Sequence, residues 1–128
     1  MGQLDGKTII ITGAAQGMGA IHARRCVEEG ANVVLTDLQT EAGSKQAEAL
    51  GDAAIFVQQD VTAEADWDRV VETALDRFGR IDGLVNNAAI WWTRPLMEED
   101  MDDVRKMFEV NLIGTWLGIR KVVPAMQQ

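Results

Sequence analysis

Three glycines, Gly13, Gly17 and Gly19, separate an apolar run at residues 8–11 from a helix-forming stretch at residues 20–29. The apolar run is mostly β-branched and predicts a short buried strand. A strand, a glycine turn and a helix in this order leave free backbone N–H groups and a positive helix end that can bind a phosphate. We expect Gly13 to form the tight turn, Gly17 to let the backbone approach a pyrophosphate, and Gly19 to let the helix pack closely on the strand. An ordinary strand-to-helix turn would need only one of these glycines.

The rest of the chain continues this alternation of strand and helix. Apolar runs predict further strands at residues 32–36, 54–57 and 81–85, and helical patterns predict helices at residues 40–50, 62–78 and from near 98 to 124. Four strands alternating with helices favour a parallel sheet with right-handed crossovers. With a glycine turn after the first strand, we predict an α/β fold, a Rossmann-like three-layer sandwich with strand order 3-2-1-4.

Size and charge limit the classes of protein that the chain can belong to. A chain of 128 residues can bury one core, and no apolar run approaches the roughly 18 residues of a membrane-spanning helix. The net charge of −8 argues against nucleic-acid and anionic-membrane partners, because both favour basic patches. The single Cys26 and an amino terminus unlike a signal peptide favour a cytoplasmic protein.

Polar residues follow the predicted strands, and in a parallel sheet these positions meet at one edge. Asp37 ends the second strand about 20 residues beyond the glycine turn, where a carboxylate can accept both ribose hydroxyls of an adenosine. Its charge would repel a 2′-phosphate, and Leu38 and Gln39 follow it rather than a basic residue, so NAD is favoured over NADP. A turn or helix-capping role would explain Asp37 equally well.

The third and fourth strand ends carry further candidates. Asp60 can accept a hydrogen bond from an adenine amino group while Val61 packs on the ring, although an aspartate that simply ends a strand is commoner. Asn86 and Asn87 can tie neighbouring strands through their side-chain amides, and the two alanines that follow leave room for ribose and nicotinamide. A turn would also explain the two asparagines.

Together these residues resemble the short-chain dehydrogenase/reductase family. The shared features are Thr12-Gly-x-x-x-Gly-x-Gly19, Asp37, Asp60-Val61, Asn86-Asn87-Ala88-Ala89 and Asn111, in order over essentially the whole chain. Ala89 stands where the family usually has glycine. The resemblance implies that NAD binds across the strand ends, with the cofactor-binding residues Gly13, Gln16, Gly17, Met18, Gly19, Asp37, Leu38, Asp60, Val61, Asn87, Ala88 and Ala89.

The resemblance also places Asn111 at the asparagine of the family's Asn-Ser-Tyr-Lys tetrad. In the family this asparagine holds a water in a proton relay, the serine orients the substrate oxygen, and the lysine lowers the pKa of the tyrosine acid/base. The 128 residues contain no tyrosine, and they end before the strand that carries the family's serine. We therefore expect residues 1–128 to form a single dinucleotide-binding domain without the carboxyl-terminal catalytic half. We expect it to be inactive alone, because acid–base catalysis contributes about 10²–10⁴-fold. A tolerated polar residue on a helix face is the alternative for Asn111.

Two other pairs of residues are weaker candidates. His22 and Cys26 lie four residues apart, and two ligands do not make a metal site, so we expect none. Trp91 and Trp92 follow the fourth strand, where they would line a substrate site or cover an exposed sheet edge.

The sequence thus predicts the NAD-binding domain of a dehydrogenase that acts on a secondary alcohol or ketone. A second hypothesis is a non-catalytic assembly module, because the edge of the fourth strand and an apolar helix stripe over residues 101–122 would be left uncovered. A homodimer through either surface would bury it, and in the family that helix commonly forms a subunit interface. Complementation by a separate carboxyl-terminal half is a third hypothesis.

Overall fold

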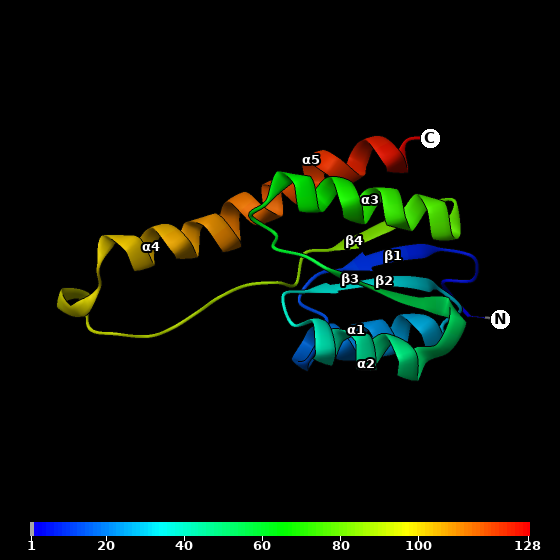
Figure 1. The fold of residues 1–128 in the computed structure, drawn as a ribbon, viewed down its shortest axis with the longest axis horizontal. Coiled ribbons are helices and arrows are strands. Elements are labelled where there is room, and N and C mark those ends of the chain that lie inside the picture. The colour runs from blue at the N-terminus through cyan, green and yellow to red at the C-terminus, as the bar shows by residue number, and fades with distance from the viewer. Residues whose placement is uncertain (1) are drawn as a thin grey trace.

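The computed structural model describes residues 2–128. One sheet contains the strands β1 (Thr8–Ile11), β2 (Asn32–Asp37), β3 (Ala54–Gln58) and β4 (Gly83–Val85). All neighbouring strands pair in parallel, and their order is β3-β2-β1-β4 (Figure 1). The predicted fold class and strand order are therefore confirmed.

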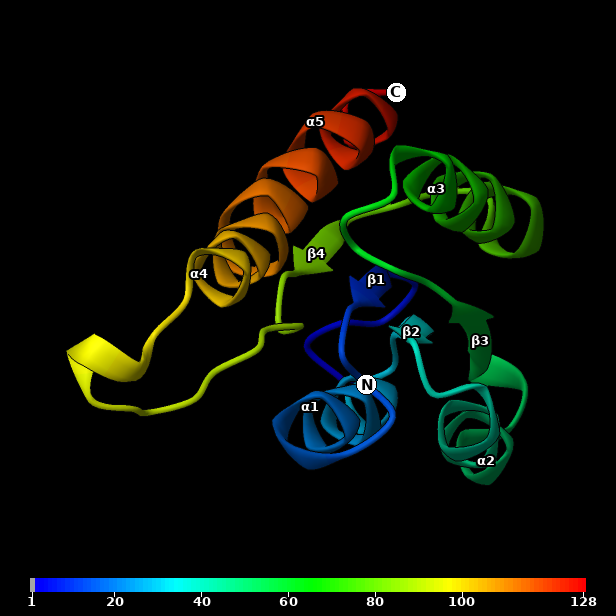
Figure 2. The ribbon, with the colours of Figure 1, turned by 60° about the vertical axis from the view of Figure 1, so that its left-hand side comes forward.

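Helices cover both faces of this sheet (Figure 2). On one face lie α1 (Gly17–Glu28) and α2 (Thr40–Leu50), and on the other lie α3 (Glu64–Phe78) and α5 (Gly114–Met126). The π-helical turn η3 (Glu109–Ile113) joins α4 (Met101–Phe108) to α5, and short 3-10 turns form η1 (Gly51–Ala53) and η2 (Leu96–Glu98). Across residues 2–128, none of these helices is both long and apolar enough to cross a membrane.

The alternation of side chains along the strands produces two core layers. Ile9, Ile11 and Val33 cluster with buried alanines of α1 and α2. Ile10 and Val34 point to the opposite face and cluster with buried residues of α3 and α5. Central strands of a parallel sheet are buried on both faces, which is why β1 and β2 are apolar without interruption at these positions.

Trp67 anchors α3 against α5. Its ring is fully buried, and its indole Nε1 donates to the backbone carbonyl of Val61 over 2.8 Å. A Cβ added to Gly118 would lie 2.7 Å from the Trp67 ring, and one added to Gly114 would lie 2.8 Å from Val61 Cγ2. These two glycines therefore allow the last helix to approach α3 and Val61 closely.

Asp82 delays the start of β4. The strand begins at Gly83 rather than at the predicted residue 81. The Asp82 carboxylate accepts from the backbone N–H of Thr8 over 2.8 Å and forms an ion pair with Arg80. The hydrogen bond from Arg80 holds the pKa of Asp82 below its usual value. Asp82 therefore serves as a side-chain cap at the start of β1 instead of a residue within β4.

The predicted start of α3 also shifts. α3 begins at Glu64 rather than Thr62, because Asp60 accepts from both the backbone N–H and the hydroxyl of Thr62 and holds it in a turn. α2 begins at Thr40, as predicted, with Gln39 at its N-cap.

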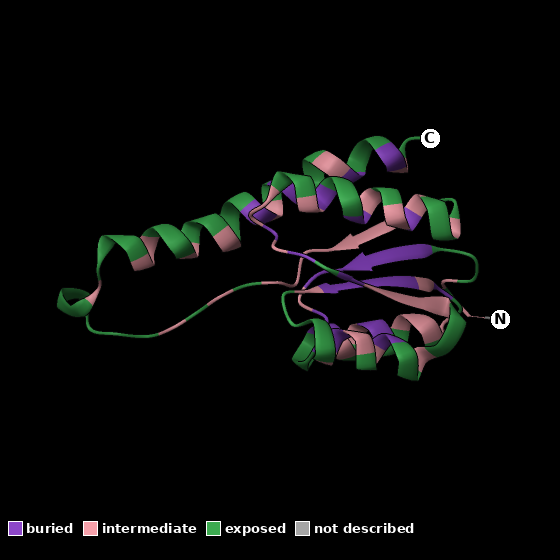
Figure 3. Ribbon diagram, in the orientation of Figure 1, coloured by how far each residue is buried: buried purple, intermediate pink, exposed green. Residues whose placement is uncertain are grey.

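Residues 91–108, called the arm below, extend beyond the sheet (Figure 1). None of the residues of α4 is buried (Figure 3). Of the predicted apolar stripe, Phe108 and Leu112 are exposed, whereas Val122 is buried in the layer between the sheet and α3. α5 continues through Pro124 to Met126 instead of ending beside the proline, which lies in the last turn of the helix.

Candidate functional site

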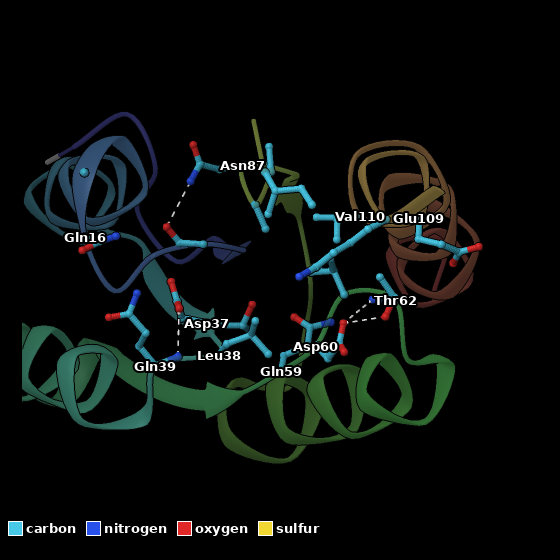
Figure 4. A pocket seen from close by; sticks show the side chains of 18 residues that line it. Gln16, Asp37, Leu38, Gln39, Gln59, Asp60, Thr62, Asn87, Glu109 and Val110 are labelled. Atoms are coloured by element: carbon cyan, nitrogen blue, oxygen red, sulfur yellow. Dashed lines mark hydrogen bonds between the residues drawn. The ribbon is translucent and has the colours of Figure 1, made fainter. Parts of the chain in front are cut away.

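A cavity of about 620 Å³ lies at the carboxyl edge of the sheet. It is lined by Gly13, Gln16, Gly17, Thr36, Asp37, Leu38, Gln39, Gln59, Asp60, Val61, Thr62, Asn87, Ala88, Ala89, Ile90, Lys106, Glu109 and Val110. All the predicted cofactor-binding residues except Met18 and Gly19 are in this lining. Figure 4 shows Asp37, Asp60 and Asn87 around one hollow, each at or just beyond the end of a different strand.

The glycine turn forms one wall of the cavity. Gly13 has a φ of 64° and Gly17 a φ of 59°, in the left-handed region that favours glycine. A Cβ added to Gly13 would lie 2.9 Å from the Cα of Ala88, whereas nothing lies within 4 Å of one added to Gly17. Gly13 therefore allows two loops to pack together, and the backbone at Gly17 remains open to a bound molecule.

The start of α1 is uncapped and lies at this wall. The helix begins at Gly17, earlier than the predicted residue 20, and the N-cap residue Gln16 makes no side-chain capping bond. Its first turn contains no acidic residue. The first N–H groups of a helix have no partner within the helix, and the positive end of its dipole lies there. An anionic group in the cavity thus finds local backbone donors in a chain whose net charge is −8.

Met18 and Gly19 lie outside the cavity lining. The Met18 side chain is exposed. A Cβ added to Gly19 would overlap the carbonyl oxygen of Gly13 and lie 2.7 Å from Asn87 Nδ2. Gly19 therefore lets α1 pack against the glycine turn and the loop after β4, rather than against β1 as predicted.

Asp37 combines a turn position with a place in the cavity. Its Oδ2 accepts from the backbone N–H of Ala15 over 3.1 Å, and its Oδ1 accepts from that of Gln39 over 3.0 Å. The first bond fixes the glycine turn against the end of β2. Because each carboxylate oxygen has a second lone pair, both can still accept from a ligand hydroxyl.

The Asp60 carboxylate likewise uses part of its hydrogen-bonding capacity for contacts within the chain. Its Oδ1 accepts from the backbone N–H of Thr62 at 2.9 Å and from the Thr62 hydroxyl at 2.7 Å. The backbone N–H of Asp60 donates to Asp66 over 2.8 Å, which fixes the orientation of the turn. Among residues 2–128, the other carboxylate oxygen of Asp60 has no partner, and Val61 lines the cavity beside it.

The Thr12 hydroxyl attaches the loop after β4 to the end of β1. Its Oγ1 accepts from the backbone N–H groups of Asn87 at 3.1 Å and of Ala88 at 2.9 Å. The side-chain amide of Asn87 donates to the carbonyl of Gly13 over 3.1 Å. Asn87 therefore makes the tie between neighbouring strands that its position predicts.

Asn111 lies in η3 and binds a loop rather than lining the cavity. Its Oδ1 accepts from the backbone N–H of Ile90 over 2.8 Å, and its Nδ2 donates to the Ile90 carbonyl over 2.7 Å. The Thr115 hydroxyl donates to the Asn111 carbonyl over 3.1 Å, and Asn86 donates to the Thr115 carbonyl over 3.5 Å. These bonds account for an asparagine inside a π-helical turn. Asn86 therefore contacts α5 instead of a neighbouring strand.

Trp91 and Trp92 belong to the arm. Trp91 is exposed. Trp92 Nε1 donates to the Glu99 carboxylate over 3.3 Å, and the Arg94 guanidinium lies 5.1 Å from the centre of the Trp92 ring. Arg94 also forms an ion pair with Asp103. These contacts hold the outgoing loop against α4, and neither tryptophan lines the cavity.

Several lining residues were not predicted. Thr36 lies near the end of β2 and Gln59 directly follows β3, and a polar residue at the end of a buried strand is a signal that could have identified them. Lys106, Glu109 and Val110 come from the last helical segment, and nothing local predicts that it passes over the strand ends. Among residues 2–128, no group of three or more His, Cys, Asp or Glu side chains is placed to hold a metal ion.

The family model described as short chain dehydrogenase matches residues 7–128. The chain belongs to this family. It is 42% identical to the 3-alpha-(or 20-beta)-hydroxysteroid dehydrogenase of Mycobacterium tuberculosis, over 99% of this chain and 49% of that protein. It is 41% identical to the trans-4-hydroxycyclohexanecarboxylate dehydrogenase of Sinomonas cyclohexanicum, over 94% of this chain and 50% of that protein. The chain thus spans about half the length of the curated relatives it matches.

A solved structure has the same fold over the matched half. The crystal structure of 3-ketoacyl-(acyl-carrier-protein) reductase from Brucella melitensis complexed with NADH is 38% identical, with a TM-score of 0.93. The match covers 96% of this chain and 51% of the reductase.

Proposed function

We propose that this chain binds NAD(H) in the cavity, as the cofactor-binding part of an oxidoreductase that acts on secondary alcohols or ketones. The observation that carries the proposal is the uncapped start of α1 at one wall, with the Asp37 and Asp60 carboxylates at the neighbouring strand ends. The group fits the residues present, because the open backbone at Gly17 provides the space and the donors that a pyrophosphate needs. The NADH bound to the Brucella reductase supports the same class of ligand.

The roles of the other residues follow from their places in the cavity. The remaining lone pairs of Asp37 accept the hydroxyls of the adenosine ribose, and its negative charge favours NAD over NADP. Asp60 and Val61 hold the adenine, with Gln16 and Leu38 at the adenosine side. Residues 87–89 accommodate the second ribose and the nicotinamide. Met18 and Gly19 act through the packing of the glycine turn.

We further propose that these 128 residues have no dehydrogenase turnover by themselves. A bound nicotinamide supplies a hydride donor or acceptor, but the family's Tyr-x-x-x-Lys pair is not in this sequence because it contains no tyrosine. Asn111 is the one residue that matches the family's tetrad, and here its side chain orients the loop at Ile90. An assay with several secondary alcohols and NAD should give no activity.

Calorimetric titration with NADH and NADPH tests the binding proposal. We expect the wild-type chain to prefer NADH. Asp37→Ala should weaken NADH binding by at least about tenfold, because a hydrogen bond to a charged group contributes about 1.5–3 kcal/mol. The same variant should lose the preference over NADPH. Asp76→Ala, which removes an exposed carboxylate outside the cavity lining, is the matched control and should bind as the wild type does. No NADH binding by the wild type would refute the proposal.

Exposed apolar side chains from the end of α4, through η3 and into α5 favour a second candidate function, a homodimeric assembly module. Phe108, Leu112, Trp116 and Ile119 are each more than half exposed and recur at the spacing of one helix face. β4 is an edge strand of the sheet, and its free edge is a second surface through which two chains could pair. Light scattering should give twice the 14.0 kDa mass of one chain, and Leu112→Glu should reduce it to one chain if the helix face is used. A monodisperse wild-type monomer would exclude this function.

A further inference from the structure

The side chain of Gln59, directly after β3, is buried with an exposed fraction of only 2%. Among residues 2–128, neither its Nε2 nor its Oε1 has a hydrogen-bond partner. Buried amides nearly always have partners, because an unpaired one has lost its bonds to water and gained none. We therefore look for the hydrogen-bond partner of the Gln59 amide in a molecule that enters the cavity.

Strand alternation places this amide on the α3 side of the sheet, at a strand end that borders the cavity. Ile55 and Val57 face the core layer under α3, and Gln59 continues on the same side of the extended backbone. The backbone N–H of Gln59 still donates to the carbonyl of Asp37 over 2.9 Å, so strand pairing fixes this orientation. Gln59 lines the cavity next to Asp60 (Figure 4).

Thr36 provides a second polar atom without a partner on the same side. It follows Val34 by two positions on β2 and lies in register with Val57 of β3. Its hydroxyl is buried, has no partner among residues 2–128, and belongs to the cavity lining. Two neighbouring strands thus present an amide and a hydroxyl at one part of the cavity wall.

We propose that Gln59, assisted by Thr36, recognises the edge of the adenine base, an inference that rests on the proposed function. A carboxamide presents an N–H donor beside a carbonyl acceptor. The adenine edge offers a ring nitrogen acceptor beside an amino donor, and glutamine pairs with this arrangement through two hydrogen bonds. A neutral amide beside two carboxylates does not suit a phosphate, for which the start of α1 provides the donors.

This role predicts opposite effects on the free protein and on the complex. The ligand-free chain carries the cost of an unpaired amide, and base binding removes that cost. Gln59→Leu deletes the unpaired atoms, so the free protein should unfold at the same or a higher temperature while the complex becomes weaker. A glutamine that only supports the fold through an internal water would instead give a lower Tm in the leucine variant, because those bonds would be lost.

Calorimetric titration of wild type and Gln59→Leu with two ligands tests the assignment. The ligands are NADH and reduced nicotinamide mononucleotide, which lacks the adenosine. We expect Gln59→Leu to bind NADH about tenfold more weakly, equivalent to about 1.4 kcal/mol, with unchanged affinity for the mononucleotide. Thr8→Val, which also removes a buried atom without a partner but lies outside the cavity lining, is the matched control and should bind NADH normally.

Three outcomes would overturn this inference alone: equal NADH affinity in Gln59→Leu, equal weakening of both ligands, or a lowered Tm of the free variant. If the wild type binds no NADH, the proposed function and the inference fail together. If the leucine variant does not fold, the NMR chemical shifts of the Gln59 side-chain NH₂ group in the wild-type protein test the inference instead. We expect NADH to shift these resonances and the mononucleotide to leave them unchanged, and any other result would overturn the inference.

Discussion

Thr12→Val tests the hydroxyl that attaches the loop after β4 to β1. Valine is nearly isosteric, so the change removes one oxygen from a buried site. The N–H group of Ala88, at 2.9 Å, loses its acceptor, whereas that of Asn87 keeps a second acceptor, the Val85 carbonyl at 3.0 Å. An unpaired buried donor costs about 1–3 kcal/mol, and the lower value applies to Ala88 because the cavity gives water access to this loop. We expect a loss of about 1 kcal/mol, or about 4 °C in Tm for a chain of this size.

Thr8→Val, at the opposite end of the same strand, is the matched control. Thr8 is also fully buried, but its hydroxyl has no partner among residues 2–128. The same substitution should therefore leave stability unchanged or raise it by about 1 kcal/mol. Urea unfolding followed by circular dichroism gives both free energies, provided that the two slopes agree. If Thr12→Val is as stable as Thr8→Val, the role assigned to the Thr12 hydroxyl is wrong.

Three further predictions concern pH dependence, reactivity and packing. Arg80 holds the pKa of Asp82 below its usual value of about 3.9, so the carboxylate stabilises the fold above about pH 4 and loses this effect as the pH falls through the lowered pKa. Asp82→Asn should therefore lose stability at pH 7 and less at pH 3 in urea unfolding, and an equal loss at both would contradict the pairing. Burial raises the pKa of the Cys26 thiol, so Ellman's reagent should modify it more slowly at pH 8 than free cysteine; an equal rate would oppose this. Gly19→Ala should cost about 1–3 kcal/mol, since overpacking against the Gly13 carbonyl outweighs the better helix propensity of alanine; an unchanged Tm would show that the turn can move.

The strand order and the composition of one cavity wall could be predicted because both depend on local patterns. Periodicity locates the strands, and the rules for parallel sheets bring their carboxyl ends to one edge. The sequence therefore places Asp37 and Asp60 near the glycine turn, and both line the same cavity as Gly13 and Gly17. What each carboxylate binds remains a prediction, since both also hold backbone groups of their own turns.

Contacts between distant residues could not be predicted. The pair of bonds between Asn111 and Ile90 depends on the path of the arm, for which neither residue carries a local signal. The placement of Lys106 over the strand ends depends on the same path. Asp82 illustrates a different difficulty, because its polar side chain was assigned to a strand when it instead caps Thr8 of the neighbouring strand.

The two bonds between Asn111 and Ile90 have a consequence for variation in length. They fix both ends of the excursion formed by the arm, so its outer part at residues 91–100 can gain or lose residues without displacing the strand ends. Loop closure adds little resistance, since doubling the length of a flexible loop costs only about 0.6 kcal/mol. Insertions can therefore accumulate here and alter whatever the arm contacts, while the cavity at the strand ends keeps its shape. Because of the two bonds between Asn111 and Ile90, residues 91–100 are the part of the fold that can vary most in sequence and length.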